Sequence, residues 1–391
     1  MQVGFGATLI LITQCLSGFV SGRMFAYERG KCENSIFNAL QDMFKMELRA
    51  IINPRFRYSN TKLLGYDLYT PLNPYKRQVL RPGDVASLQK SYFNPKWPVR
   101  FSIHGWTGKS THCSNAAIKD AYLSRGNYNV IVVDWSIYSL DISYSRLSKQ
   151  LSAIAAALVK FVRFLHQTTG APYEQMYLVG HSAGSHISGL AGKLLKPQRF
   201  GAIFALDPAG LSQLNLGPRD RLAPDDAIYV ESIHSDITLL GNPSVELSQA
   251  SFFANWGQGQ PQCPNATAAE FDFACDHFAA LYYFAQSIRD PKMFGALGCD
   301  SQQSITTASC GCRQDNSKDS SDKKTCTADG FMGGEPAVPK SGIYYFSTKR
   351  QPPYGHGDGL VHMRTPIEST ILESSVLPRG LFRRSMRPTT V

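Results

Sequence analysis

A sharp turn around one serine is the feature that most constrains how this chain can fold. The segment from Gly180 to Gly184 reads G-x-S-x-G, follows an apolar run and precedes a helical pattern. A side chain at either glycine would collide with the adjoining strand or helix, and the turn pushes the Ser182 hydroxyl outward. The pattern therefore predicts a serine nucleophile at a strand, turn and helix junction.

Short apolar or β-branched runs on both sides of this motif end at turn-forming residues, which is typical of buried strands. We expect strands over Pro98–His104, Asn129–Trp135, Met176–Gly180, Ile203–Asp207 and Ile228–His234. Helical spacing of apolar residues runs from about Arg146 to Leu165, and a second helix is expected just after Ser182. Strands that alternate with helices predict an α/β fold with a mainly parallel central sheet flanked by helices.

A serine hydroxyl is a weak nucleophile and needs a base that is held by an acid. After G-x-S-x-G, both partners are expected downstream in the order Asp, then His. Asp207 ends an expected strand and precedes a proline, which places its carboxyl at the edge of the sheet where sites of α/β folds lie. We predict that Asp207 is the acid, with a helix N-cap or turn role as the alternative.

Four histidines follow Asp207 and could supply the base: His234, His277, His356 and His362. His277 is preferred because it adjoins Cys275, whose disulfide would fix the loop, and because a helical stretch follows. His234 ends a strand and is interpreted as a structural histidine. The last two lie in glycine-rich or terminal segments, so the sequence predicts His277 as the base.

Acyl transfer also needs N–H donors aimed at the oxyanion that develops on the substrate. The residue after the nucleophile, Ala183, offers one backbone N–H. Trp106 can offer a second, because it lies in the turn that follows the strand ending at Ile103. An ordinary strand-ending turn is the alternative for this segment.

The cysteine count and the first residues indicate the compartment. Residues 1–22 are apolar or small from Val3 to Val20 and read as a secretory signal peptide, although the lack of an early Lys or Arg leaves a signal anchor open. Of nine cysteines, one lies in this segment, and the remaining even number is typical of disulfides in a secreted chain. A zinc site is disfavoured because no paired CxxC motifs are present. Asn265 lies in a sequon and is predicted to be glycosylated.

The formal charge of +10 raises the question of an anionic partner. The basic residues are scattered and do not interleave with aromatic residues, so nucleic acid is not expected. An anionic lipid or glycan surface and a generally basic soluble surface both remain open. Residues 367–391 lose periodicity, carry several arginines and are predicted to be a disordered tail, which leaves one catalytic domain over 23–366.

Taken together, the motifs resemble the pancreatic-lipase family, including its insect members and the secreted phospholipase A1 enzymes, from about Cys32 to Pro366. The similar segments are His104-Gly105-Trp106, Gly180-His181-Ser182-Ala183-Gly184-Ser185-His186, Leu206-Asp207-Pro208-Ala209 and Cys275-Asp276-His277. The resemblance implies an α/β-hydrolase fold and a secreted enzyme that hydrolyses lipid esters without a cofactor. It also implies the disulfides Cys32–Cys113, Cys263–Cys275, Cys299–Cys310 and Cys312–Cys326.

Length and departures from the family pattern refine these expectations. The segment between Cys263 and Cys275 corresponds to the family's lid and is short. Long lids accompany the family's triacylglycerol lipases and short ones its phospholipases. Phospholipid therefore becomes a credible substrate, and triacylglycerol stays open. Ala183 stands where leucine is usual. Pro218 and Ala223 replace expected carboxylates in the family's calcium segment, although Arg221 and Asp226 align, so no metal is expected.

The end of the chain leaves no room for the β-sandwich with which pancreatic enzymes bind colipase, so no colipase partner is expected. The expected partner is lipid at a membrane or lipoprotein surface. The alternative function is that of a non-catalytic lipid-binding or yolk-protein-like member of the same fold. The presence of all three triad residues argues against it.

Overall fold

The computed structural model describes residues 64–139, 144–210, 217–263, 274–312 and 325–364. The predicted signal peptide 1–22, the predicted tail 367–391, Cys32 and the predicted glycosylation site Asn265 lie outside the described residues. No helix within the described ranges combines the length and the apolar character that crossing a membrane requires.

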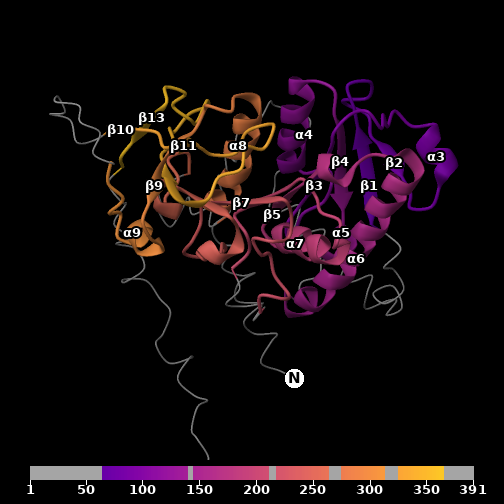
Figure 1. The fold of residues 1–391 in the computed structure, drawn as a ribbon, viewed down its shortest axis with the longest axis horizontal. Helices are drawn as coiled ribbons and strands as arrows, with labels where there is room; N and C mark the ends of the chain where they lie inside the picture. The colour runs from indigo at the N-terminus through magenta and orange to yellow at the C-terminus, as the bar shows by residue number, and fades with distance from the viewer. Residues whose placement is uncertain (1–63, 140–143, 211–216, 264–273, 313–324, 365–391) are drawn as a thin grey trace, which may run out of the picture.

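One large sheet organises the described chain (Figure 1). Its strands in sequence order are β1 Gly65–Tyr69, β2 Gln78–Leu80, β3 Val99–Ile103, β4 Asn129–Asp134, β5 Met176–His181, β6 Ala202–Leu206, β7 Tyr229–His234, β8 Ala250–Ala254, β9 Gly295–Cys299, β11 Gly330–Phe331 and β12 Gly342–Phe346. Their order in space is β11-β9-β12-β8-β7-β6-β5-β3-β4-β1-β2. The strands from β12 to β4 in this order pair in parallel, whereas the pairings of β1, β2, β9 and β11 are antiparallel.

Helices cover both faces of this sheet. The α-helices are α3 Val85–Gln89, α4 Cys113–Arg125, α5 Ser136–Ser139, α6 Tyr144–Thr169, α7 Ala183–Leu195, α8 Cys275–Arg289 and α9 Gln302–Thr306. Figure 1 shows α4 and α8 on one side of the sheet and α6 and α7 on the other. A separate two-stranded ribbon joins β10, Thr325–Thr327, to β13, Leu360–His362.

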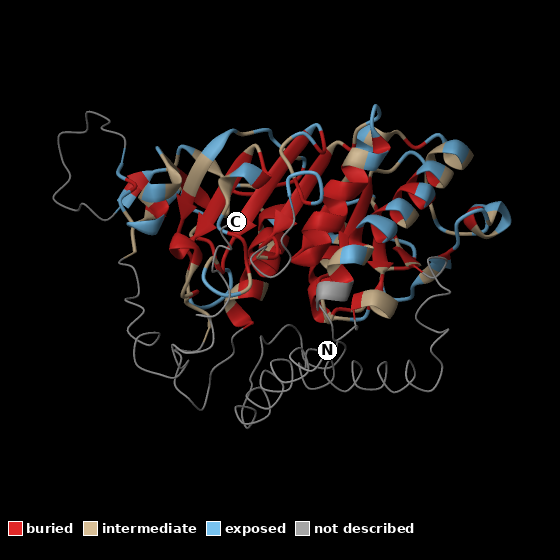
Figure 2. Cartoon of the chain, turned by 90° about the horizontal axis from the view of Figure 1, so that it is seen from below, coloured by how far each residue is buried: buried red, intermediate tan, exposed pale blue. Residues whose placement is uncertain are grey.

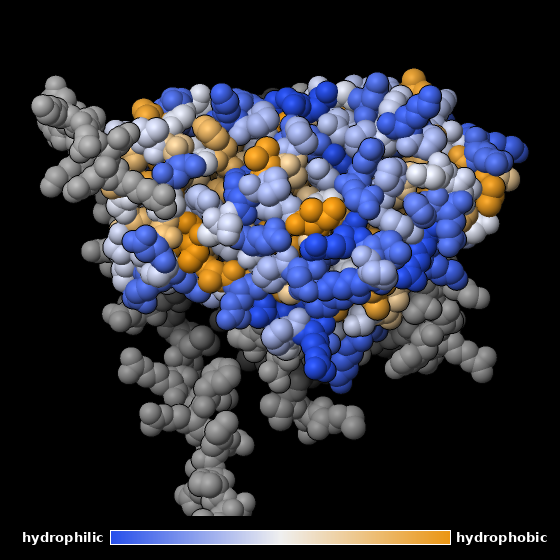
Figure 3. All heavy atoms as spheres, in the orientation of Figure 1, coloured by the Kyte–Doolittle hydropathy of each residue, from blue (hydrophilic) through white to orange (hydrophobic). Residues whose placement is uncertain are grey.

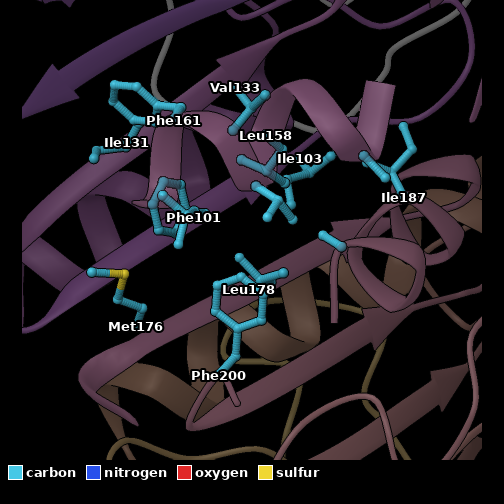
Figure 4. Close-up of a cluster of buried hydrophobic side chains, with 14 of the residues drawn as sticks. Phe101, Ile103, Ile131, Val133, Leu158, Phe161, Met176, Leu178, Ile187 and Phe200 are labelled. Carbon is cyan, nitrogen blue, oxygen red and sulfur yellow. The ribbon is translucent and has the colours of Figure 1, made fainter. Parts of the chain in front are cut away.

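Successive side chains of the central strands point to opposite faces of the sheet and pack into two hydrophobic cores. On β3 and β4, Phe101, Ile103, Ile131 and Val133 face the side covered by α6, whereas Val130 faces the α4 and α8 side. Figure 4 shows the first of these cores, in which Leu158 and Phe161 of α6 meet side chains of β3, β4 and β5. Because both faces are covered, the strands are buried along nearly their whole length, as the red band in Figure 2 shows.

The predicted class, an α/β-hydrolase fold with a mainly parallel sheet flanked by helices, is confirmed. All five predicted strands correspond to β3, β4, β5, β6 and β7 within about two residues, and the two predicted helices correspond to α6 and α7. The helix predicted from Arg146 to Leu165 is longer at both ends in the structure. This arrangement places the carboxyl ends of β3, β5 and β6 side by side, which is where the candidate site is built.

Candidate active site

Ser182 occupies a strained turn between β5 and α7. Its backbone has φ 56° and ψ −122°, a conformation that a residue with a side chain rarely adopts. Two glycines make this turn possible: a Cβ on Gly180 would lie 2.4 Å from the Gly184 carbonyl oxygen, and one on Gly184 would lie 2.3 Å from the Ile103 carbonyl oxygen. Backbone atoms that approach this closely therefore require glycine at both positions.

The turn after β3 packs directly against the serine. A Cβ on Gly105 would lie 2.7 Å from the Cβ of Ser182, so only glycine permits this approach. Ala183, the first residue of α7, is fully buried at the same place. Trp106, half-buried, packs against the core on the α6 side. The structure thus brings the two predicted oxyanion segments to either side of Ser182.

His104 supports the turn at Gly105 through contacts with Gly105 and Trp135. Nε2 of His104 lies 3.3 Å from the Trp135 backbone nitrogen and 3.7 Å from Oδ1 of Asp134, and Nδ1 lies 3.0 Å from the Gly105 carbonyl oxygen. The His104 and Trp135 rings stack at 5.0 Å, and the Trp135 indole N–H donates to the His104 carbonyl at 2.8 Å. These contacts make His104 a positioning residue for the Gly105 turn.

Asp207 and His277 meet beside the serine. Nδ1 of His277 lies 2.5 Å from Oδ2 of Asp207, and both side chains are buried. The Ser182 backbone N–H donates to the carbonyl of Leu206, which directly precedes Asp207, at 3.0 Å. The ring of His181, the residue before the nucleophile, lies 4.6 Å from the ring of His277. Three residues that are distant in sequence therefore converge at one edge of the sheet.

The second oxygen of Asp207 is fixed by backbone donors that the sequence analysis did not single out. Oδ1 accepts the N–H groups of Ser235 at 2.7 Å and Asp236 at 3.0 Å, immediately after β7. Gly241 permits the approach on the other side, because a Cβ there would lie 2.6 Å from Oδ2. Burial raises the pKa of Asp207 to about 6, and the hydrogen bond from His277 opposes that rise.

A buried glutamine, also missed from sequence, joins this network to the segment before Cys263. The Gln260 amide nitrogen donates to the carbonyls of Ser235 and Ala254, each at 2.9 Å. Its backbone N–H donates to the carboxylate of Asp276, the neighbour of His277, at 2.9 Å. Burial raises the pKa of Asp276 to about 7. No local pattern identifies this glutamine, because its partners come from distant segments.

The other candidate histidines lie elsewhere. His234 is buried, stacks on Phe253 at 4.4 Å and bonds the Asn242 carbonyl at 2.8 Å, which agrees with its structural interpretation. His356 and His362 stack on each other at 3.9 Å. Among the four histidines that follow Asp207, His277 is the one whose ring contacts the Asp207 carboxyl.

The disulfides follow the pairing that the family resemblance implied. The structure joins Cys263 to Cys275, Cys299 to Cys310, and Cys312 to Cys326. Cys113 is also disulfide-bonded, and its predicted partner Cys32 lies outside the described residues. The Cys263–Cys275 bond closes the segment that corresponds to the family's lid, directly before His277.

The segment that corresponds to the family's calcium site holds a lysine ammonium group. Nζ of Lys193 lies 2.7 and 2.5 Å from the two carboxylate oxygens of Asp226 and 2.8 Å from the Arg221 carbonyl oxygen. One Asp226 oxygen also accepts the Ala223 N–H at 2.8 Å. The oxygen atoms that could bind calcium in this segment already contact the Lys193 ammonium group. They therefore do not fit a calcium ion.

Comparisons with known proteins agree with this architecture. The chain is 32% identical over 247 residues to lipase member H of Danio rerio, which covers 62% of this chain and 53% of that protein. It is 29% identical to phospholipase A1 member A of Bos taurus, over 62% of this chain and 52% of that one, and 30% identical to pancreatic lipase-related protein 2 of Cavia porcellus, over 64% and 56%. The chain spans about half the length of the curated relatives it matches.

Among solved structures, the acetyl xylan esterase from Aspergillus awamori is similar with a TM-score of 0.30 and 14% identity, over 47% of this chain and 72% of that one. The family model named Lipase, in contrast, matches residues 33–354, which is most of the chain. This chain therefore belongs to the Lipase family.

Proposed function

We propose that this protein is a serine carboxylic ester hydrolase that acts on lipids through an acyl-enzyme on Ser182. The observation that carries the proposal is the 2.5 Å contact between Asp207 and His277 beside a serine held at φ 56°. This is the constellation that serine hydrolases use, in which an acid orients a base and the base activates the serine.

The proposed reaction has two halves. The Ser182 hydroxyl oxygen attacks the acyl carbonyl carbon while Nε2 of His277 takes the hydroxyl proton, and the same proton then passes to the leaving alcohol. Asp207 keeps the Nδ1 proton of His277 in place and stabilises the imidazolium that forms. The backbone N–H groups of Trp106 and Ala183 bind the oxyanion. Water, activated by His277, releases the fatty acid in the second half.

The substrate class rests on the relatives and on the size of the Cys263–Cys275 segment. One relative is named phospholipase A1 member A and another lipase member H, and the cysteines that bound the lid segment are 12 positions apart. Because short lids accompany the phospholipases of the family, we propose phospholipid as the preferred substrate over triacylglycerol.

The proposed setting is extracellular, at a membrane or lipoprotein surface. Disulfides persist in oxidising compartments, and at least three join described residues. On the face drawn in Figure 3, exposed hydrophobic residues form small separate patches within a hydrophilic surface. Neither nucleic acid nor colipase is part of the proposal.

The test follows fatty-acid release from phosphatidylcholine, phosphatidylserine and triolein by the chain that begins at Arg23. Ser182→Ala is expected to lose roughly a thousandfold or more in kcat/KM while staying folded. Ser124→Ala, which changes an exposed serine on α4, is the matched control and is expected to keep full activity. Lipids with different acyl chains at the two glycerol positions identify the ester bond that is cleaved.

Equal inactivity of both chains on every lipid would contradict the proposal. If the wild type and Ser182→Ala were equally inactive but still bound lipid vesicles, a non-catalytic lipid-binding function would replace the proposed hydrolase function.

A further inference from the structure

Three side chains of one short segment converge near the end of the described chain. His356, Asp358 and His362 each offer one ligand atom, and these atoms lie within 4.8 Å of one another. A second group of this kind in the described ranges is Asp207, Asp236 and His277, which belongs to the site above. The proposed hydrolysis gives the first group no role, so its convergence requires another explanation.

The backbone that carries these residues is held in a defined turn. A Cβ on Gly355 would lie 2.2 Å from the Met293 carbonyl oxygen, and the Gly357 N–H donates to the same oxygen at 3.1 Å. Asp358 lies between Gly357 and Gly359, whose φ angles of 72° and 73° are rarely adopted by residues with a side chain. The two glycines therefore set the direction in which the Asp358 carboxyl leaves the turn.

The polar atoms of the three side chains lie close together. Oδ1 of Asp358 accepts the Leu360 N–H at 3.0 Å, and Oδ2 lies 2.9 Å from Nε2 of His362, the last residue of β13. Nε2 of His356 lies 3.3 Å from the Ser347 hydroxyl, and its ring stacks on that of His362 at 3.9 Å. One carboxylate oxygen and two imidazoles are thus gathered by one turn and one strand end.

We propose that His356, Asp358 and His362 bind a divalent transition-metal ion, with Zn²⁺ as the physiological candidate. Two imidazoles and one carboxylate, with water as the fourth ligand, are a ligand set that Zn²⁺ accepts. Imidazole ligands favour zinc, copper and nickel over magnesium and calcium, which prefer oxygen. Tetrahedral Zn²⁺ with bonds of about 2.0–2.1 Å needs ligand atoms about 3.3 Å apart. The candidate ligand atoms lie within 4.8 Å of one another, and Asp358 Oδ2 lies 2.9 Å from His362 Nε2, so small rotations of these partly or fully exposed side chains can bring the atoms to that separation.

The ion would stabilise the ribbon of β10 and β13 near the end of the described chain. β13 pairs with β10, which carries Cys326 of the Cys312–Cys326 disulfide. Figure 1 places this ribbon next to β9, at one end of the described part of the chain. A ligand that binds the folded state alone stabilises it in proportion to the logarithm of its free concentration. The proposed ion therefore stabilises this ribbon and takes no part in chemistry at Ser182.

The test titrates ZnCl₂ into the full chain, purified without a histidine tag, and measures binding by calorimetry and by the rise in Tm. Co²⁺, whose visible absorption reports nitrogen and oxygen ligands in a tetrahedral site, gives a second readout. The variants are His362→Ala and Asp358→Asn; the asparagine keeps an oxygen for the Leu360 N–H but removes the charge. The controls are His277→Ala, which disrupts the other ligand group, and His166→Ala, which removes a half-buried histidine of α6.

We expect one equivalent of Zn²⁺ per wild-type chain, unchanged in both controls. His362→Ala is expected to weaken Zn²⁺ binding more than about 100-fold. Losing a residue that only hydrogen-bonds a metal ligand costs about 10–100-fold, so a larger loss indicates a direct ligand. Asp358→Asn is expected to weaken it by about tenfold or more. The proposal is overturned if wild type binds no Zn²⁺, or if binding survives in His362→Ala and is lost in His277→Ala. Neither result depends on hydrolytic activity, so the proposed function is tested separately.

Discussion

Nδ1 of His277 lies 2.5 Å from Oδ2 of Asp207, and the other oxygen of that carboxyl accepts two backbone N–H groups that follow β7. The carboxyl therefore has no freedom to turn away from the imidazole. This contact fixes which nitrogen of His277 carries the proton, and it leaves Nε2 as the acceptor for the Ser182 hydroxyl proton.

The first prediction concerns pH. Burial raises the pKa of Asp207 to about 6, so the Asp207–His277 pair takes up a proton as the pH falls through that region. A pair that already holds this extra proton cannot accept one from Ser182. We expect kcat/KM to fall about tenfold per pH unit below pH 6, as for loss of one essential base. A profile that stayed flat down to pH 4 would contradict this assignment.

The second prediction removes the acid without changing its shape. Asp207→Asn is expected to lower kcat by about four orders of magnitude, because the amide favours the wrong imidazole tautomer. Activity measured across pH, with Tm as a control for folding, checks the expectation. If the variant kept more than a tenth of wild-type kcat, another residue would have to orient His277.

A third prediction tests the nucleophile turn. A Cβ on Gly184 would lie 2.3 Å from the Ile103 carbonyl oxygen and 2.7 Å from that of His104, and backbone atoms cannot move aside cheaply. Gly184→Ala is expected to lower the free energy of unfolding by about 1–3 kcal/mol or more and to reduce activity sharply. Urea unfolding checks this. Gly217→Ala is the control, because a Cβ there meets no atom of the described residues within 4 Å, and a similar loss in it would refute the steric explanation.

The fourth prediction concerns His104, which bonds both the Gly105 carbonyl and the Trp135 N–H. Without the ring, the turn that presents Trp106 loses its support. His104→Ala is expected to lower kcat by about 10²–10³-fold, the usual effect of losing one oxyanion donor, with little change in KM. Steady-state kinetics on a soluble ester checks this, and an effect confined to KM would place His104 in substrate binding.

The sequence was informative where local patterns and tertiary structure agree. The strands β3 to β7 are apolar runs buried on both faces, so their composition alone identified them. β9 was missed because it reads Gly-Ala-Leu-Gly-Cys, and its extended form depends on pairing with β12 rather than on propensity. β1 was missed as well, since it contains a buried aspartate, Asp67, whose carboxylate is paired with Arg77 and accepts a hydrogen bond from Ser110 only in the folded chain.

Some residues of the candidate site could be predicted from sequence motifs, and others could not. Ser182, Asp207 and His277 lie in motifs whose spacing is visible in one dimension. Gln260, in contrast, acts through the Ser235 and Ala254 carbonyls, and nothing in its own surroundings indicates this. Glutamine and lysine are ordinary surface residues, so only the folded structure reveals the instances that are buried and paired.

The fifth prediction concerns the segment that corresponds to the family's calcium site. Asp226 is fully buried, and Lys193 supplies the positive charge beside it. Removing one partner of a buried ion pair leaves the other charge uncompensated. Lys193→Ala is therefore expected to lower the free energy of unfolding by about 3 kcal/mol. Lys196→Ala, three residues on, breaks an exposed pair with Asp225 and is expected to cost about 0–1 kcal/mol.

The same contact predicts how the protein responds to metal removal. Because an ammonium group already neutralises Asp226, EDTA is expected to leave the urea midpoint of the His362→Ala variant unchanged, and CaCl₂ is expected to add no stability to it. A chelator can also remove an ion from His356, Asp358 and His362, so the measurement is made in the His362→Ala background. If EDTA destabilised that variant and CaCl₂ restored it, calcium rather than Lys193 would be the cation that Asp226 requires.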